Sequence, residues 1–212
     1  MKTRKKRFNL LCIYALLLLL LPSVYARADS GESFDEGVDT RVEITGFSPY
    51  GGDPGFSFLS EGDRIAVLSP SALPDRGRIE TTLAGLRSWG FEPVEGNAVG
   101  GETRTLEELA DDLRWALVDP EVKAIFCVRG GYGATEVLDA LTPELIASAN
   151  KPIVGFSDIT AFHGAWTRAG QPSIHASMST AFGDDFPADC AEAEKRMMKG
   201  ELPAYNMKLY LI

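Results

Sequence analysis

The sequence contains few of the side chains that bind metals or form disulfide bonds. Its 212 residues include only two histidines, His163 and His175, and three cysteines. It has no CxxC spacing and no group of cysteine and histidine of the kind that holds structural zinc. Cys127 lies inside the apolar run AIFCV, where a thiol acts as a small buried hydrophobic group. The sequence therefore predicts no metal site.

Positive charge is also scarce. The chain has 21 Lys and Arg residues against 30 Asp and Glu residues, which gives a formal net charge of −9. Proteins that bind nucleic acid need a basic surface to neutralise the phosphates. We therefore expect no nucleic-acid partner, and the acidic balance favours a small-molecule or cell-wall substrate over an anionic polymer.

The apolar run near the start of the chain is too short to cross a membrane. It follows the basic stretch MKTRKKRF and is interrupted by Pro22 after about twelve residues, whereas a span needs about 20. A basic start, a short apolar run and a small residue before the cleavage point are the parts of a secretory signal peptide. The sequence therefore predicts a signal peptide over residues 1–26, cleavage after Ala26 or Ala28, an exported protein (periplasmic or extracellular), and no stable membrane span.

The rest of the chain separates into three parts. Residues 27–62 are rich in Gly, Ser, Asp and Pro and are expected to form a poorly structured leader. Residues 63–186 alternate between apolar strands and amphipathic helices, and residues 187–212 are expected to hold one more helix and a tail. Strands are expected at 63–70, 91–96, 122–128, 152–156 and 173–176, and helices at 74–90, 103–120, 134–141, 158–170 and 188–199. This alternation predicts an α/β fold with a doubly wound, mainly parallel sheet.

Two short polar segments follow strands of this sheet. RGGYG (129–133) follows the strand expected at 122–128, and FSD (156–158) follows the strand expected at 152–156. In open parallel sheets, ligands bind at the carboxyl ends of the strands. Both segments are therefore expected at the same edge of the sheet, as parts of one site.

Ser157 in FSD has two readings. As an N-cap, its hydroxyl would accept a hydrogen bond from a backbone N–H two or three residues later. As a nucleophile, it would stand on a tight turn between strand and helix, where backbone N–H groups are available for a developing oxyanion. Spacing alone favours the N-cap, and GFSDI does not match the GxSxG motif.

The RGGYG segment also has more than one reading. Its adjacent glycines let backbone N–H groups approach a ligand closely, beside Arg129. A phosphate-binding nest and a simple turn are the alternatives. Because the segment matches neither GxxxxGK[ST] nor GxGxxG, the sequence predicts no nucleotide or other cofactor.

Neither histidine is expected to be the base that activates Ser157. His163 lies six residues later on the expected helix, nearly two turns away, which is too far to take the serine's proton. His175 ends the expected strand at 173–176 and could line the same edge of the sheet. A structural or pocket-lining role is favoured for it.

Four segments, in this order and spacing, resemble the amino-terminal half of the LD-carboxypeptidase family: GDRIAVLSPS, FCVRGGYGATEVLDAL, KPIVGFSDITAFH and SIHASM. The family consists of serine peptidases, also called muramoyltetrapeptide carboxypeptidases, and includes the microcin C self-immunity peptidases. The resemblance covers about residues 62–186. It implies a flavodoxin-like amino-terminal domain, and the removal of a terminal D-amino acid, typically D-alanine, from murein tetrapeptides.

The resemblance also implies roles for individual residues. Ser157 would be the acylating nucleophile, and the backbone N–H groups of Asp158 and Gly131 would form the oxyanion hole. The substrate-binding residues would be Arg129, Gly130, Tyr132 and His175. The loop that contains the last of these reads HASM where many members have HGPM, which makes its fit to the family pattern less close.

The resemblance implies that the glutamate and histidine that activate the serine come from a carboxyl-terminal domain, which we expect to be missing from this sequence. We therefore assign no catalytic Glu or His, and expect a truncated chain with little activity of its own. The surface that a second domain would cover is expected to invite association, such as a homodimer. The alternatives are a non-catalytic exported module that binds murein peptides, and an unrelated flavodoxin-like or nucleotide-binding domain, which rests on fold class alone.

Overall fold

The structure is a computed structural model, and it describes residues 58–101 and 104–201. The predicted signal peptide, the predicted leader up to residue 57 and the tail from residue 202 lie outside the described residues. Within the described ranges, no helix has both the length and the apolar character needed to cross a membrane.

Strands and helices alternate along the described chain as the sequence predicts. The strands are β1 (Arg64–Leu68), β2 (Glu92–Glu95), β3 (Val122–Cys127), β4 (Ile153–Gly155) and β5 (Ser173–His175). The helices are α2 (Arg76–Ser88), α3 (Leu106–Val118), α4 (Ala134–Asp139), α5 (Pro143–Ala149), α6 (Thr160–Arg168) and α7 (Ala188–Met198). Two short 3₁₀ segments, η1 (Ser157–Ile159) and η2 (Ser179–Phe182), complete the described chain.

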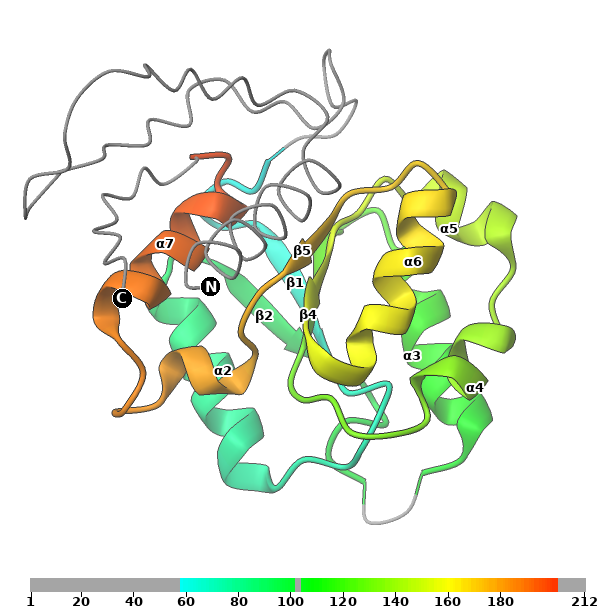
Figure 1. Ribbon diagram of the computed structural model, residues 1–212, viewed down its shortest axis with the longest axis horizontal. Helices are drawn as coiled ribbons and strands as arrows, with labels where there is room; N and C mark the ends of the chain where they lie inside the picture. The colour runs from blue at the N-terminus through cyan, green and yellow to red at the C-terminus, as the bar shows by residue number, and fades with distance from the viewer. Residues whose placement is uncertain (1–57, 102–103, 202–212) are drawn as a thin grey trace, which may run out of the picture. The chain divides into compact units, whose positions relative to one another are not determined.

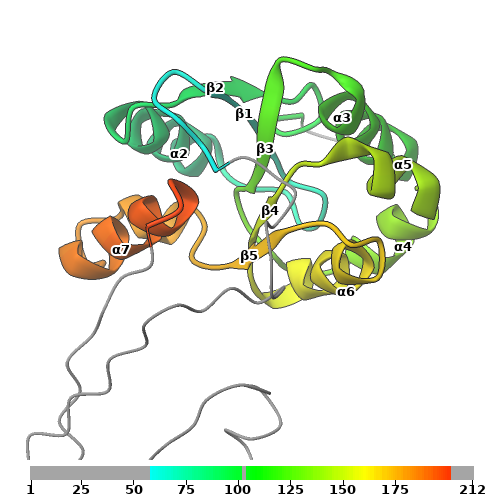
Figure 2. The same ribbon diagram turned by 90° about the horizontal axis from the view of Figure 1, so that it is seen from above.

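The five strands of the described sheet are all parallel and lie in the order β2-β1-β3-β4-β5. This is the strand order of flavodoxin-like folds, and it confirms the predicted doubly wound α/β class. Helices α2 and α7 cover one face of the sheet, and α3, α4, α5 and α6 cover the other (Figures 1 and 2). The strand order reverses between β1 and β3, which is the place where ligands bind in such sheets.

The central strands β1 and β3 form the middle of the core. Their side chains over residues 65–68 and 124–127 are almost completely buried, as expected for strands covered by helices on both faces. The apolar residues that recur at helical spacing in α2 and at its end are buried as well: Ile79, Leu83, Leu86 and Trp89. Helix α7 adds Met198 to the same core.

The helix boundaries follow from local signals in the sequence. Helix α3 begins at a capping box, in which the Thr105 hydroxyl accepts from the Glu108 N–H and the Glu108 carboxylate accepts from the Thr105 N–H. Helix α5 was not predicted, because its apolar stripe is short. Both of its ends are nevertheless capped. The Thr142 hydroxyl accepts from the Leu145 N–H in the first turn, and Asn150 ends the helix in the left-handed conformation, with a φ of +51°.

Glu194 is a buried acidic residue on α7, with 5% of its surface exposed. Its Oε2 accepts a hydrogen bond from the Ser177 N–H at 3.1 Å, so the side chain anchors the loop that follows β5. Burial raises the pKa of the Glu194 carboxyl to about 8, although the hydrogen bond from Ser177 acts in the opposite direction.

We expect the protein to become less stable as the pH rises from about 5 to about 8, because of Glu194. In this window the folded state keeps its proton, whereas the unfolded carboxyl ionises near its usual value of 4.5. Each pH unit therefore lowers the free energy of unfolding by up to about 1.4 kcal/mol. Denaturant titrations at pH 5.5 and 8 measure the change, and Glu194→Gln, which stays neutral, is expected to reduce it. Equal pH dependence in the two proteins would contradict the prediction.

Candidate active site

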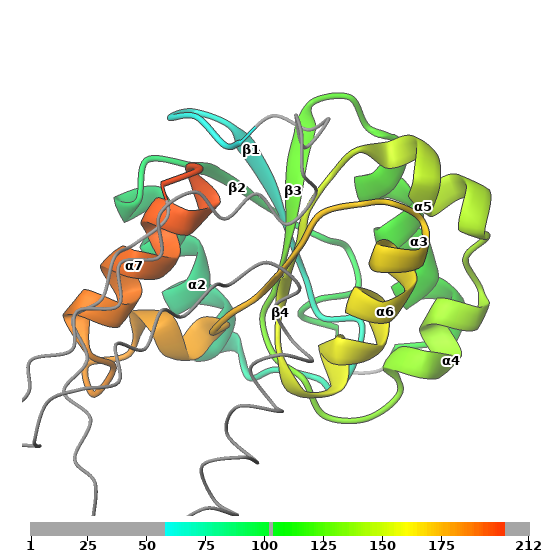
Figure 3. The same cartoon turned by 45° about the horizontal axis from the view of Figure 1, so that its top comes forward.

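Three turns meet at the edge of the sheet where β1, β3 and β4 end. They are the turn after β1 (69–75), the RGGYG turn after β3 (129–133) and the FSD turn after β4 (156–158) (Figures 1 and 3). Hydrogen bonds of Ser71 and Asp158 join all three. As the parallel topology led us to expect, RGGYG and FSD lie against each other.

Ser157 occupies a strained position at the first residue of η1. Its φ is +64°, in the left-handed region that residues with a Cβ rarely adopt, at a cost of roughly 1–2 kcal/mol. The residue is exposed, and its hydroxyl has no hydrogen-bond partner among the described residues. Phe156 is the N-cap of η1, and no side chain caps η1 or α6. The N-cap reading of Ser157 is therefore wrong, because an N-cap residue has an extended backbone and accepts from a helix N–H, whereas Ser157 has a positive φ and its hydroxyl makes no such bond.

A glycine at position 157 is expected to give a more stable protein than an alanine. Both variants lose the hydroxyl, but only Ser157→Gly relieves the strain of the positive φ. After the extra entropy of glycine in the unfolded chain is subtracted, a net difference of about 0.5–1 kcal/mol remains. Denaturant unfolding of Ser157→Gly and Ser157→Ala measures this difference. If the glycine variant were the less stable one, the turn would not be strained.

The two glycines of RGGYG make room for two different neighbours. A Cβ on Gly130 would lie 3.0 Å from the Ser157 Cβ and 3.2 Å from both the Ser157 Oγ and the Asp158 N. A Cβ on Gly131 would lie 2.4 Å from the Ala72 Cβ, and its φ of +138° also favours glycine. The bare backbone at 130 therefore faces the serine, and the bare backbone at 131 admits the turn after β1.

The other residues with predicted substrate roles differ in how firmly they are held. Arg129 is half-buried, and its guanidinium donates to two backbone oxygens, including that of Leu73 at 3.1 Å. Tyr132 is 91% exposed. His175 is exposed at the end of β5, with its ring edge-on to that of Phe156 at a centroid distance of 6.4 Å. Arg129 is thus fixed by the backbone, whereas Tyr132 and His175 project into solvent.

His163 is attached to a strand rather than to the serine. Its Nε2 lies 2.9 Å from the Gly155 carbonyl oxygen, and because a carbonyl oxygen only accepts, this nitrogen donates. Burial lowers the pKa of His163, which favours the neutral ring. Within the described part of the chain, no histidine or glutamate is hydrogen-bonded to Ser157.

Sequence reasoning missed the side chains that join the three turns. The Asp158 carboxylate accepts from the Ser71 hydroxyl at 2.5 Å and from the Ala134 N–H at 3.0 Å. The Arg104 guanidinium donates to the backbone oxygens of Ser69 and Ser71 at 2.8 and 2.9 Å, and burial lowers its pKa. Ser71 ends the LSPS segment and could have been found there. No local sequence pattern marks Arg104 as part of the site, because its partners lie 35 and 33 residues earlier in the chain.

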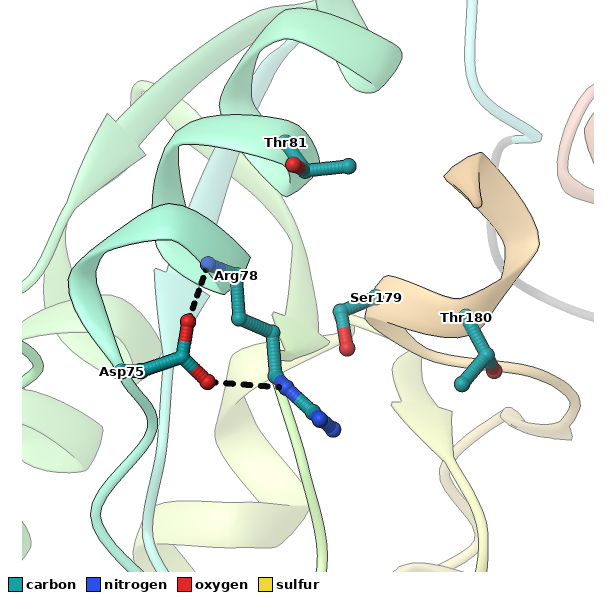
Figure 4. A pocket seen from close by; sticks show the side chains of 5 residues that line it. All are labelled: Asp75, Arg78, Thr81, Ser179 and Thr180. Atoms are coloured by element: carbon teal, nitrogen blue, oxygen red, sulfur yellow. Dashed lines mark hydrogen bonds and ion pairs between the residues drawn. The ribbon is translucent and has the colours of Figure 1, made fainter. Parts of the chain in front are cut away.

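A shallow hollow lies between the start of α2 and η2 (Figure 4). Its lining residues are Asp75, Arg78, Thr81, Ser179 and Thr180. Asp75 accepts from the Arg78 N–H at 2.8 Å and pairs with its guanidinium at 3.4 Å, so the two charges satisfy each other. The hollow contains none of the predicted site residues, and we assign it no ligand. In the described ranges, no three His, Cys, Asp or Glu side chains gather as a metal site would require.

Known proteins match the part of the chain that carries the RGGYG and FSD turns. The family model of the LD-carboxypeptidase N-terminal domain matches residues 65–176, which is more than half of the chain. The murein tetrapeptide carboxypeptidase of Pseudomonas aeruginosa is 34% identical over 125 residues, or 57% of this chain and 41% of that protein.

Solved structures of similar proteins share the fold. The muramoyltetrapeptide carboxypeptidase of Oxalobacter formigenes superposes with a TM-score of 0.58 at 25% identity, over 63% of this chain and 47% of the other. An MccF-like protein of Bacillus anthracis gives a TM-score of 0.62 at 26% identity, over 68% and 46% of the two chains.

Each of these matches covers less than half of the relative's own length. The chain spans between 41% and 44% of the length of four curated relatives. The family model, the sequence relatives and the shared parallel sheet nevertheless agree on the same region. The chain therefore belongs to the LD-carboxypeptidase family, of which it carries the amino-terminal domain.

Proposed function

We propose that this domain supplies the nucleophile and the oxyanion hole of a serine carboxypeptidase that removes the terminal D-amino acid from murein tetrapeptides. The observation that carries the proposal is the strained, exposed Ser157 set against the bare backbone at Gly130. Acyl-transfer enzymes use this kind of turn, with a serine between strand and helix beside backbone N–H donors. The relatives support the substrate class, because two of them are named for a murein or muramoyl tetrapeptide.

In the proposed reaction, the Ser157 Oγ attacks the carbonyl carbon of the bond between the L-centre and the terminal D-residue. The backbone N–H groups of Asp158 and Gly131 stabilise the oxyanion that forms. The bond to the D-residue then breaks, its nitrogen takes up a proton and leaves as the free amine, and an acyl-enzyme remains. Water hydrolyses this ester and restores the hydroxyl. The base that takes the serine's proton is proposed to come from outside the described residues.

Four residues at the same edge are proposed to bind the peptide. The Arg129 guanidinium has five N–H donors, and its two contacts with backbone oxygens leave others for a substrate carboxylate. Gly130 lets the substrate backbone come close to Ser157. The exposed side chains of Tyr132 and His175 are suited to lie along the peptide on either side of the scissile bond.

The proposal is tested by D-alanine release from L-Ala-γ-D-Glu-meso-diaminopimelate-D-Ala, with the complete gene product as the enzyme. We expect release from this peptide and none from the same peptide ending in L-Ala. The 212-residue chain by itself is expected to release little, because the described residues hold no base for Ser157. Absence of release by the complete product would contradict a carboxypeptidase. Calorimetric heat on tetrapeptide binding would then favour a non-catalytic binding module.

We further infer export from the sequence pattern of residues 1–26, which lie outside the described residues. Amino-terminal sequencing of the protein recovered from its natural host checks this inference. The expected first residue is Arg27 or Asp29. A mature protein that still begins at Met1 would contradict export by cleavage.

A further inference from the structure

We infer that the side chains of Asp158 and Ser71 position the RGGYG turn for the oxyanion hole. This role is separate from the backbone N–H that the proposed function assigns to Asp158. The catalytic consequence of the inference rests on the proposed function, whereas its structural part does not depend on the substrate.

One oxygen of the Asp158 carboxylate links the FSD turn both to the turn after β1 and to the end of the RGGYG turn. Its Oδ2 accepts from the Ser71 Oγ at 2.5 Å, across 87 residues of chain, and from the Ala134 N–H at 3.0 Å, across 24 residues. Ser71 lies in the turn after β1, and Ala134 directly follows RGGYG. Asp158 is the residue after Ser157, so its side chain sets the distance from both turns to the nucleophile.

Ser71 is itself firmly held. The residue is 5% exposed, and its backbone oxygen accepts from the Arg104 guanidinium at 2.9 Å. Its Oγ also lies 3.3 Å from the Tyr132 carbonyl oxygen. The hydroxyl has a single proton, which is directed at the nearer acceptor, Asp158. Ser71 therefore contacts RGGYG and the serine turn at the same time.

The RGGYG turn needs such an anchor because its own sequence fixes it poorly. Gly131 and Gly133 both have positive φ values, +138° and +107°, and glycine is free to leave such conformations. Gly133 is the N-cap of α4 and has no side chain to accept a hydrogen bond. The Asp158 carboxylate supplies that acceptor from another part of the chain. A displacement of the turn by about 1 Å is expected to cost about 100-fold in rate.

The geometry argues against a direct proton-transfer role for this carboxylate. Its Oδ2 already accepts two hydrogen bonds, and the structure has no hydrogen bond between it and the Ser157 hydroxyl. Asp158 therefore acts through the turns that it holds, as a positioning residue.

Kinetics of D-alanine release by the complete gene product test the inference. Asp158→Ala and Ser71→Ala each keep the backbone N–H groups, and each is expected to lower kcat by about 10- to 100-fold with KM changed less than about threefold. Asp158→Asn keeps an acceptor and Ser71→Thr keeps the hydroxyl, so both are expected to retain most of the activity. The double variant Asp158→Ala/Ser71→Ala is expected to be little worse than Asp158→Ala alone, because the two side chains act as a unit.

The controls and outcomes separate this inference from the proposed function. Asp185→Ala and Ser148→Ala, at exposed positions away from the three turns, are expected to leave kcat unchanged. If Ser157→Ala abolishes release while Asp158→Ala and Ser71→Ala behave like wild type, the inference fails and the proposed function holds. If Asp158→Asn is as inactive as Asp158→Ala and the pH profile of kcat changes shape, Asp158 is a base and the inference fails.

Hydrogen exchange in the 212-residue chain provides a readout without substrate. The Ala134 amide, which donates to Asp158, is expected to exchange at least about tenfold faster in Asp158→Ala, and its neighbours in RGGYG faster in Ser71→Ala. The amides of β3 are expected to keep their protection. Unchanged exchange around Ala134 would overturn the inference. If the complete product releases no D-alanine but this result is obtained, the proposed function fails and the structural role of Asp158 and Ser71 remains.

Discussion

Ser157→Ala in the complete gene product is expected to slow D-alanine release by at least about 10⁴-fold. The hydroxyl oxygen forms the acyl-enzyme in the proposed reaction, and among residues 58–101 and 104–201 no other hydroxyl is proposed to replace it. Binding is expected to persist, because the proposed contacts of the substrate are with the backbone and with Arg129, Tyr132 and His175. Initial rates of D-alanine release, with tetrapeptide binding measured by calorimetry on the same samples, check both parts.

The alanine variant is a clean test because position 157 is exposed and its hydroxyl has no partner among the described residues. The loss of activity is therefore expected without a loss of stability, which Ser148→Ala, another exposed serine, helps to calibrate. A Ser157→Ala protein that releases D-alanine within tenfold of the wild-type rate would end the assignment of Ser157 as nucleophile.

Gly131→Ala is expected to give the second largest loss of activity, about 100- to 1,000-fold, which is the usual effect of removing one oxyanion-hole donor. The new Cβ would lie 2.4 Å from that of Ala72 and 3.2 Å from the Ala72 N, so the backbone of the turn must move. A φ of +138° is also unfavourable for alanine. The rate of D-alanine release, compared with thermal unfolding of the same variant, measures the effect on the site apart from the effect on the fold.

Gly133→Ala is the matched control for this prediction. Gly133 lies in the same turn and has a φ of +107°, but a Cβ there would meet nothing within 4 Å. It shares the backbone penalty without the collision, and a smaller loss of activity is expected. Ala72→Gly removes the atom that the new Cβ strikes, so it is expected to restore part of the activity of Gly131→Ala. Equal losses in Gly131→Ala and Gly133→Ala would show that the contact with Ala72 does not position the site.

The sequence was a good guide to the sheet because β1, β3 and β4 are short and mostly apolar. In VKAIFCV and PIVGF every residue except Lys123 and Phe156 is buried, and such strands stand out as short apolar runs between amphipathic helices. The order of the strands then places RGGYG and FSD at one edge. The parallel topology alone was therefore enough to bring the two turns together, before any side-chain contact was known.

The side-chain contacts of the site were much less predictable. The resemblance points to the backbone N–H of Asp158 but not to its carboxylate, whose partners Ser71 and Ala134 are distant in the sequence. Arg104 was missed for the same reason. Lys151 reads as a surface residue, yet it is buried, and its ammonium donates to the backbone oxygens of Ala116 and Asp119 at the end of α3. Local patterns carry no information on such long-range polar contacts.

The N-cap reading of Ser157 failed for a different physical reason. Serine before a helix usually accepts a hydrogen bond from the first turn, and this statistical preference is correct for most helices. Here the φ of Ser157 is positive, whereas an N-cap residue needs an extended backbone, and no side chain caps η1 or α6. A single backbone angle decided the question, and single-sequence patterns do not encode it.

The hydrogen bond between Ser71 and Asp158 has a consequence for biosynthesis. The two residues are 87 positions apart, so the first has long left the ribosome when the second is added to the chain. The segment that contains β1 and β3 can begin to pair in that interval, whereas the glycine turn must wait for the carboxylate that anchors it. In a nascent chain we therefore expect β1 and β3 to pair first. The RGGYG turn and Ser157 are expected to reach their final positions later.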